Sequence, residues 1–248
     1  MLTSHDITQD YILGGRISIR QPSSGYRVAI DPVFLASSIN AMKGDTILDV
    51  GAGVGSSSLC LALRIPGLKI TGLEIQKSMV RLASENIAIN NMRNSIEMLN
   101  GNLIAPPPRL AAGTFSHVMV NPPYLEEISS SIKYVNENSK ISHLQKISFE
   151  TWAKFCMLMV RPNGTITFIH SADKLDSILS IFSGKVGDIC VYPLWPGNND
   201  PAKRVIVSVR KNSKKPMKIL QGIKLQDSTG KYSRDAEHIL RDGCALDW

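Results

Sequence analysis

Asn121, Pro122, Pro123 and Tyr124 form the stretch of this sequence with the most specific chemical potential. The exocyclic amine of a purine is a poor nucleophile, because its lone pair is delocalised into the ring. The Asn121 side-chain oxygen and the Pro122 carbonyl can accept both amine hydrogens and favour a more tetrahedral nitrogen. Pro123 restricts Pro122 to extended geometry, and the Tyr124 ring can stack on a base. The stretch predicts chemistry on an amine, with an ordinary Asn-Pro turn as the alternative.

A glycine-rich turn follows the expected strand Ile47–Val50. Within it, Asp49 precedes Gly51, Gly53 and Gly55, which stand at alternate positions before a helical pattern begins. Glycine lets a backbone turn sharply and a ligand approach closely, and a helix start offers N–H groups to a polar ligand. The spacing differs from the Gly-x-Gly-x-x-Gly of dinucleotide-binding proteins. We therefore expect a ligand site here, with a turn that binds nothing as the alternative.

Glu74 ends the next expected strand, 19 residues beyond Gly55. An acid at this place can accept hydrogen bonds from both ribose hydroxyls of a nucleoside cofactor. A solvated acid at a strand end is the competing interpretation. The distance from the glycine turn favours the cofactor site.

The elements that must position these residues alternate between strand and helix from Thr46 onward. Near-continuous apolar strands predict an α/β fold with a parallel sheet that is covered by helices on both faces. Residues 125–141 are polar, rich in serine and without periodicity, so we expect a mobile loop there. The strands are expected at 47–50, 69–74, 96–100, 115–120, 165–170, 187–193 and 204–210, and the helices at 57–65, 76–91, 148–160 and 172–183.

The first residues read as an addition to this sheet. Two short alternating runs surround Gly14-Gly15, which is typical of a hairpin, and Asp31-Pro32 resembles an N-cap acid followed by proline at the first helical position. We therefore divide the chain into a hairpin and helix extension, residues 1–42, and a main domain, residues 43–248. Tyr26, Arg27 and Asp31 are candidates for substrate contact or for ordinary loop and capping roles.

The composition is that of a globular protein, with 43% hydrophobic and 20% charged residues. A net charge of +7 and a pI near 9.3 suggest a polyanionic partner. No apolar run is long enough for a membrane span and no signal peptide opens the chain, and the histidines lack metal-ligand spacing. We expect a reduced, cytoplasmic protein that uses no metal and no membrane.

Several segments carry a resemblance to known families. The glycine turn resembles motif I of the class I methyltransferases that use S-adenosylmethionine (SAM), and Asn-Pro-Pro-Tyr resembles the acceptor motif of amino-methyltransferases. Further segments make the chain similar to the tRNA1(Val) adenine-N6 methyltransferase family nearly from end to end. They are residues 21–31, 72–76, 200–204 and 230–233.

The resemblance implies a Rossmann-like, doubly wound sheet, SAM as cofactor, and methylation of the adenosine 3′ of the anticodon, position 37, in a valine tRNA. It implies catalytic roles for Asn121, Pro122 and Tyr124. The cofactor-binding residues that it implies are Asp49, Gly51, Gly53, Gly55, Glu74, Ile75, Asn102, Leu103 and Asn121. The family usually has aspartate where this chain has Asn102, so that contact to the cofactor adenine lacks a charge.

Three alternatives stay open from the sequence: a protein glutamine-amide methyltransferase, another RNA or DNA amino-methyltransferase, and a weakly catalytic SAM-binding RNA assembly factor. A concentration of basic residues near the carboxyl end would by itself be read as a solvated face; because the resemblance already implies an RNA substrate, we weigh RNA binding above it. We favour a monomer. The basic residues are Lys203, Arg204, Arg210, Lys211, Lys214, Lys215 and Lys218.

Overall fold

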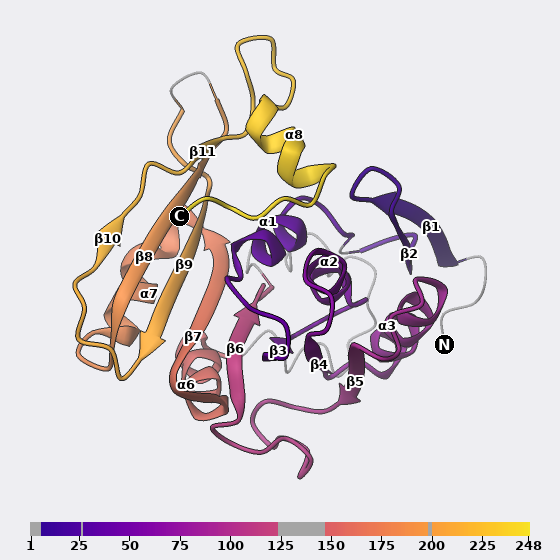
Figure 1. Cartoon of the computed structure of the whole chain (residues 1–248), viewed down its shortest axis with the longest axis horizontal. Helices are drawn as coiled ribbons and strands as arrows, with labels where there is room; N and C mark the ends of the chain where they lie inside the picture. Colours follow the sequence, from indigo (N-terminus) through magenta and orange to yellow (C-terminus); the bar gives the residue numbers. More distant parts are fainter. Residues whose placement is uncertain (1–5, 26, 124–146, 198–199) are drawn as a thin grey trace.

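The computed structural model describes residues 6–25, 27–123, 147–197 and 200–248. Within them, a 9-stranded sheet forms the centre and a separate two-stranded hairpin lies beside it (Figure 1). The sheet strands are β3 Thr46–Val50, β4 Lys69–Glu74, β5 Ile96–Asn100, β6 Phe115–Val120, β7 Val160–Ser171, β8 Val186–Trp195, β9 Arg204–Lys211, β10 Lys218–Ile219 and β11 Ile223–Lys224. The helices are α1 Asp31–Ser38, α2 Ser56–Arg64, α3 Lys77–Ile89, α6 Phe149–Met159, α7 Leu175–Phe182 and α8 Arg234–Leu240, with a 3-10 turn at Ala172–Lys174.

The strand order along the sheet is β10-β8-β9-β7-β6-β3-β4-β5, and β11 also pairs with β8. Strands β5, β4, β3, β6 and β7 are parallel, whereas β9 runs antiparallel between β7 and β8. This arrangement confirms the doubly wound α/β prediction, and the antiparallel hairpin β8–β9 extends the parallel part of the sheet. The sheet continues beyond that hairpin, because β10 and β11 add parallel to β8.

Helices cover both faces of the sheet, as the apolar strands predict. One apolar cluster joins the sheet to α1, α2, α3 and α8, and a second joins its other face to α6 and α7. Both clusters are filled by the β-branched and aromatic side chains that alternate along the strands. None of the helices in the described ranges is both long and apolar enough to cross a bilayer.

The N-terminal hairpin consists of β1 Ile7–Ile12 and β2 Ile17–Pro22, which confirms the sequence prediction. Its turn is wider than a Gly-Gly pair, because buried Leu13 also adopts a positive φ of 51°. Two asparagine side chains, one in α3 and one at its C-cap, bind the outer edge of β2: Asn90 pairs with both backbone groups of Ser18, and Asn86 with both groups of Arg20. The side chains thus replace a missing neighbour strand.

Helix α1 is buried along its whole length. The expected capping role of Asp31 is wrong: Ile30 occupies the N-cap position without a side-chain hydrogen bond, and Asp31 is the first helical residue. Its carboxylate instead accepts a hydrogen bond from the Arg204 guanidinium at 3.2 Å. This ion pair fastens α1 to the start of β9, so Asp31 and Arg204 are engaged with each other.

The structure differs from the sequence prediction in three places. Strand β7 begins at Val160 rather than at the expected residue 165, and the irregularity is absorbed by a shift in its pairing with β6 and by the positive φ of Asn163. The expected helix 172–183 starts as a 3-10 turn. The chain after β9 was not assigned from the sequence. It forms β10, β11 and α8, and Trp248 donates from its indole to the Ser38 carbonyl at the end of α1.

Candidate active site

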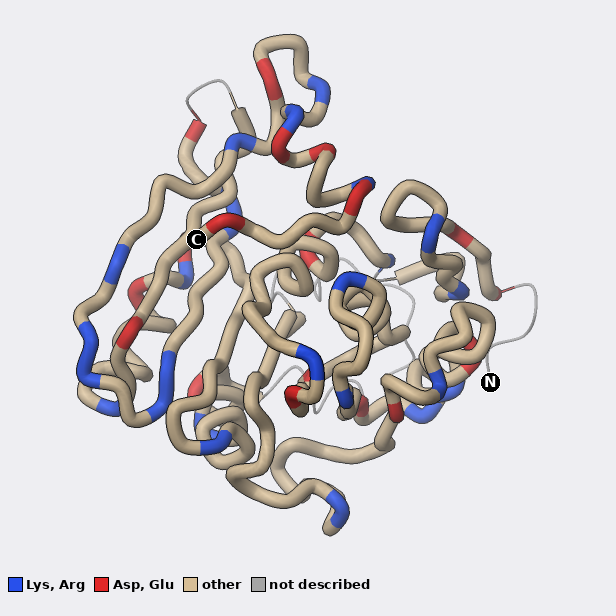
Figure 2. The backbone as a smooth tube through the Cα atoms, viewed as in Figure 1, with Lys and Arg blue, Asp and Glu red and all other residues tan. Residues whose placement is uncertain are grey.

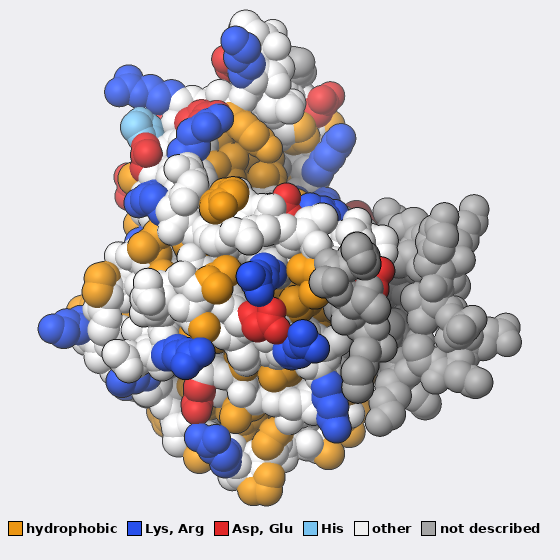
Figure 3. Space-filling model, turned by 90° about the vertical axis from the view of Figure 1, so that its right-hand side faces the viewer, with side chains coloured by type: hydrophobic (Ala, Val, Ile, Leu, Met, Phe, Trp, Pro, Cys, Tyr) orange, Lys and Arg blue, Asp and Glu red, His pale blue; other side chains and the backbone are white. Residues whose placement is uncertain are grey.

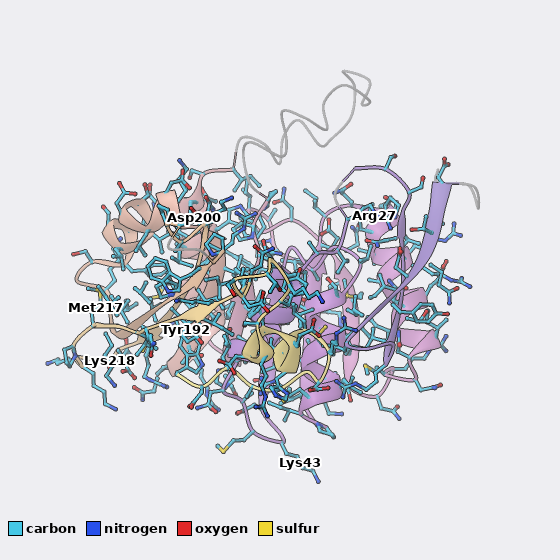
Figure 4. All side chains as sticks on the ribbon, turned by 90° about the horizontal axis from the view of Figure 1, so that it is seen from above. Arg27, Lys43, Tyr192, Asp200, Met217 and Lys218 are labelled. Atoms are coloured by element: carbon cyan, nitrogen blue, oxygen red, sulfur yellow. The ribbon has the colours of Figure 1, made fainter. Side chains whose placement is uncertain are left out.

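The residues with chemical potential follow strands that are neighbours in the sheet. Strand β3 lies between β6 and β4, and Val50 pairs with both Val120 and Leu73. Because carboxyl ends of parallel strands meet at one edge, the glycine turn, Glu74 and Asn121 lie at adjacent strand ends, ~4.8 Å from strand to strand. In the view of Figure 4, Arg27 and Asp200 lie toward the top of the picture, and Lys43, which precedes the amino end of β3, lies at the bottom.

The three glycines of the turn all have positive φ, of 73°, 54° and 83° for Gly51, Gly53 and Gly55. Their surroundings differ. A Cβ at Gly51 would lie 2.8 Å from the Trp152 ring, and one at Gly55 would lie 3.4 Å from Ala83, whereas one at Gly53 would meet no atom within 4 Å. Gly51 and Gly55 therefore serve close packing against α6 and α3. Gly53 borders open space.

Glu74 is 6% exposed at the end of β4. One carboxylate oxygen accepts from the Gly53 N–H at 3.0 Å and the other from the Gln76 N–H at 2.8 Å. Burial raises the pKa of Glu74, and these N–H donors oppose the rise. A carboxylate has about four acceptor positions. Glu74 can therefore accept further hydrogen bonds from a bound hydroxyl pair while it holds the glycine turn in place.

Asp49 is a second buried acid, 2% exposed, at the end of β3. Its Oδ2 accepts from the Ser58 hydroxyl at 2.7 Å. Burial raises the pKa of Asp49 to about 7, the Ser58 hydrogen bonds oppose the rise, and the negative charge of Glu74 adds to it. Two acids in a poorly solvated region favour a cation between or beside them. Ser58 was not predicted as a site residue, although its position in the first turn of α2 was available from the sequence.

The end of β5 supports the neighbouring strand end. The Asn100 side-chain amide donates to the carbonyls of Glu74 and Ile75, at 3.0 and 2.9 Å. Asn102 turns its own oxygen back to the Ile104 N–H at 2.9 Å, and Leu103 is buried. The Asn102 oxygen, which is predicted to contact a cofactor, thus already accepts a hydrogen bond within its own loop and has a second lone pair available for a ligand.

Asn121, Pro122 and Pro123 directly follow the carboxyl end of β6; Asn121 is half-buried, Pro122 is buried and Pro123 is exposed. The predicted Tyr124 and the 125–141 loop lie outside the described residues. The neighbouring strand β7 pairs Phe168 with Val120. Beyond that pair, Phe149 of α6 stands edge-on to His170, with ring centroids 5.6 Å apart, so an aromatic wall lines the second cluster near this strand end.

Arg27, a candidate for substrate contact, instead binds within the N-terminal extension. Its guanidinium donates to Asp10 at 2.8 Å and to the Thr8 hydroxyl at 3.0 Å. Gln21 donates to the same Asp10 oxygen, and these donors keep the pKa of Asp10 below its usual value. The network joins the hairpin to the chain that enters α1.

Comparison with known proteins defines the class first. Residues 25–139 match the family model described as the methyltransferase small domain. The fold resembles a predicted O-methyltransferase from Agrobacterium tumefaciens, with a TM-score of 0.71 at 18% identity over 88% of this chain and 98% of that one. The structure thus has the class I fold of SAM-dependent methyltransferases, and the family match confirms the predicted class and its cofactor.

Within this class, the sequence is similar to a tRNA1(Val) (adenine(37)-N6)-methyltransferase of Haemophilus influenzae, at 29% identity over 61% of this chain. The chain spans 64% of that relative's length. It is also 20% identical to the rRNA N(6)-adenosine-methyltransferase metl-5 of Caenorhabditis elegans, over 73% of this chain and 78% of the relative. These matches confirm the resemblance drawn from the motifs.

Proposed function

We propose that this protein transfers a methyl group from SAM to the exocyclic amine of an adenosine in tRNA. The finer expectation is N6 of adenine 37 in a valine tRNA. The observation that carries the proposal is the adjacency of β4, β3 and β6: it brings a buried acid, a glycine turn and the Asn-Pro-Pro sequence to one edge of the sheet. Both relatives described above are named as enzymes that act on adenine N6 in RNA.

The described residues fit the proposed cofactor. Gly53 borders open space where the backbone turns, Glu74 keeps acceptor positions for a ribose diol, and the Asp49–Glu74 acid pair suits a cationic ligand. Ile75 and Asn102–Leu103 would flank the adenine of the cofactor, at the ends of β4 and β5. When bound, SAM supplies an electrophilic methyl group on a positively charged sulfur.

On this proposal, Asn121 and Pro122 do the work on the acceptor. The Asn121 side-chain oxygen and the Pro122 carbonyl accept the two amine hydrogens and orient the nitrogen lone pair toward the methyl carbon. Bound SAM would supply the methyl carbon to the amine nitrogen, and the electron pair of the broken sulfur–carbon bond would stay on sulfur. The methylated amine then loses its proton to water, so no strong general base is required. Tyr124 completes the motif as a stacking surface for the base.

The test is nucleoside mass spectrometry of tRNA incubated with the protein and SAM. We expect N6-methyladenosine, and we expect Asn121→Ala to lower kcat by roughly 100- to 1000-fold, the cost of removing one preorganised polar group, with little effect on the dissociation constant of SAM. Asn94→Ala, at an exposed asparagine, is the matched control and should keep wild-type turnover. Methylation of a protein glutamine amide in place of tRNA would overturn the proposal, and SAM binding without any turnover would favour an assembly factor.

Cofactor binding has a separate test. Glu74→Ala should weaken SAM binding by about 1.5–3 kcal/mol, the range for hydrogen bonds to a charged group, as measured by calorimetric titration. Glu97→Ala, at an exposed acid in β5, controls for the loss of one negative charge. Equal SAM affinity in both variants would remove Glu74 from the site.

A further inference from the structure

The basic residues near the carboxyl end do not form one surface. The Lys211 ammonium donates to the carbonyls of Met157 and Val160 at 2.7 and 2.9 Å, where it closes the end of α6. Arg210 binds Asp188 and the Asn163 carbonyl. Arg204 is held by Asp31. These three cations stabilise the fold, so they are poor candidates for contact with a large partner.

Four other lysines lie along the outer edge of the sheet, and we call them the lysine track: Lys214, Lys215, Lys218 and Lys224. Each is exposed, and none forms an ion pair within the described part of the chain. Residues 211–226 contain no acid. Figure 2 shows basic positions along the left-hand margin beside β8, and Figure 4 shows Met217 and Lys218 at that margin, away from Lys43.

The pairing of this segment with β8 fixes the direction of the track. The Lys215 carbonyl accepts from the Asp188 N–H at 2.9 Å, Lys218 pairs with Cys190, and Lys224 pairs with Trp195. From Asp188 to Trp195 a strand rises by ~24 Å. Because β8 runs parallel to β7, the Lys224 end of the track lies beside the carboxyl ends of the parallel strands, where Asn121 also lies. The Lys214–Lys215 end lies beside their amino ends.

Two explanations compete for such a row of lysines. Lysine on an outer strand prevents edge-to-edge pairing with another chain, and exposed Ile219 and Met217, at 70% and 47%, give this edge something to protect. Alternatively, the row binds a polyanion. On the part of the opposite side that Figure 3 draws in colour, acidic side chains stand next to basic ones. The track segment, residues 211–226, contains no acid and begins beside the strand ends that carry Asn121, which favours the explanation that the lysines bind a polyanion.

We propose that the lysine track binds the phosphate backbone of a structured RNA at a distance from the base that is methylated. This inference rests on the proposed function. Four strand spacings separate β6 from β11, ~19 Å, and the track extends ~24 Å further along β8. At ~3.4 Å per stacked nucleotide, an RNA must continue about six nucleotides beyond the methylated base to reach the near end of the track, and about seven more to reach its far end. A short stem–loop does not extend to the far end, so the partner is a folded RNA of tRNA size.

Charge reversal separates the two explanations. The variant Lys214→Glu/Lys215→Glu/Lys218→Glu keeps the sheet edge charged, so edge protection persists, whereas phosphate binding is lost. The matched control is Lys43→Glu/Lys69→Glu/Arg93→Glu, which makes the same change in net charge at exposed positions beside β3, β4 and β5. Binding of whole tRNA and of a short anticodon stem–loop is measured by fluorescence anisotropy over a range of salt concentrations. SAM titration of both variants checks that they are folded.

We expect the track variant to bind tRNA roughly tenfold or more weakly than the control, with a salt slope flatter by about 2–3 units of log affinity per log salt, close to one per lost phosphate contact. The short stem–loop should bind both variants alike. Equal tRNA affinities and equal salt slopes in the two variants would overturn the proposal that the track binds RNA. So would loss of binding to phosphatidylserine vesicles with tRNA binding intact, since the row would then be a membrane contact. Absence of methylated tRNA with the wild-type protein would instead reject the proposed function.

Discussion

Asp49 allows a direct test of how the candidate site is built, because its charge should oppose folding. The carboxyl group is 2% exposed and its pKa is raised from 3.8 to about 7, chiefly by burial. An acid whose pKa is higher in the folded protein binds protons more tightly there. Its penalty is therefore absent below the unfolded pKa, grows as the pH rises, and is complete above the folded pKa. The full penalty is ~4 kcal/mol.

The perturbation is Asp49→Asn, which keeps the size of the side chain and an oxygen that can accept from the Ser58 hydroxyl. Between pH 5 and pH 8, the stability of the variant relative to wild type should rise by about 3 kcal/mol, because the wild-type protein loses ~1.4 kcal/mol per pH unit up to about 7. Urea denaturation at the two pH values measures this difference. Ser58→Ala should act in the opposite direction, since the ionised carboxylate loses its donor.

One outcome of the urea denaturation experiment would refute this reasoning. If Asp49→Asn changes the free energy of unfolding equally at pH 5 and pH 8, the carboxylate titrates as an ordinary surface acid and the account of a buried acid pair is wrong. Glu74 also has a raised pKa and contributes to the pH dependence of both proteins. The difference between wild type and Asp49→Asn cancels the contribution of Glu74, apart from the repulsion between Glu74 and Asp49.

Three further predictions test individual contacts. Gly53→Ala should cost only the left-handed strain of about 1–2 kcal/mol and weaken SAM binding, whereas Gly51→Ala should destabilise the fold further because its Cβ would press on Trp152; thermal denaturation and SAM titration of the pair distinguish the two. Asn86→Ala should lower stability by roughly 2–4 kcal/mol, more than Asn90→Ala, because Asn86 is fully buried and also holds the Val54 carbonyl. Lys211→Met should cost about 1–2 kcal/mol in urea unfolding and leave tRNA affinity unchanged.

The sheet and the placement of the motifs could be predicted from the sequence, because each signal is local. Apolar runs such as Phe115–Val120 specify strands, and a right-handed strand–helix–strand connection brings successive carboxyl ends to one edge. The positions of the glycine turn, Glu74 and Asn121 follow from that rule alone. Their roles stay predictions until the binding and turnover assays described above are made.

Contacts between distant segments could not be predicted in this way. Asn86 and Asn90 have the sequence pattern of ordinary polar positions on α3, yet they bind β2, 66 and 72 residues away. Lys211 stands in a basic run that favours a solvated or RNA-binding face, although its ammonium closes α6. The short helix α8 lacks the length that makes periodicity informative, and its place depends on a tail that ends with Trp248 against Tyr192.

The two buried acids give a physical reason to connect stability with the proposed cofactor. Folding brings Asp49 and Glu74 into one poorly solvated region where each disfavours the charge of the other, and neutral residues there would make the fold more stable. A ligand that carries a positive charge reverses this cost, because an opposite charge nearby lowers the pKa of a carboxyl group. Part of the energy spent on burying the acids is then recovered when a cation binds beside them. The acid pair thus lowers the free energy of unfolding of the ligand-free protein above pH 7. It would also bind the positively charged methyl donor more tightly than the demethylated product, whose sulfur is neutral.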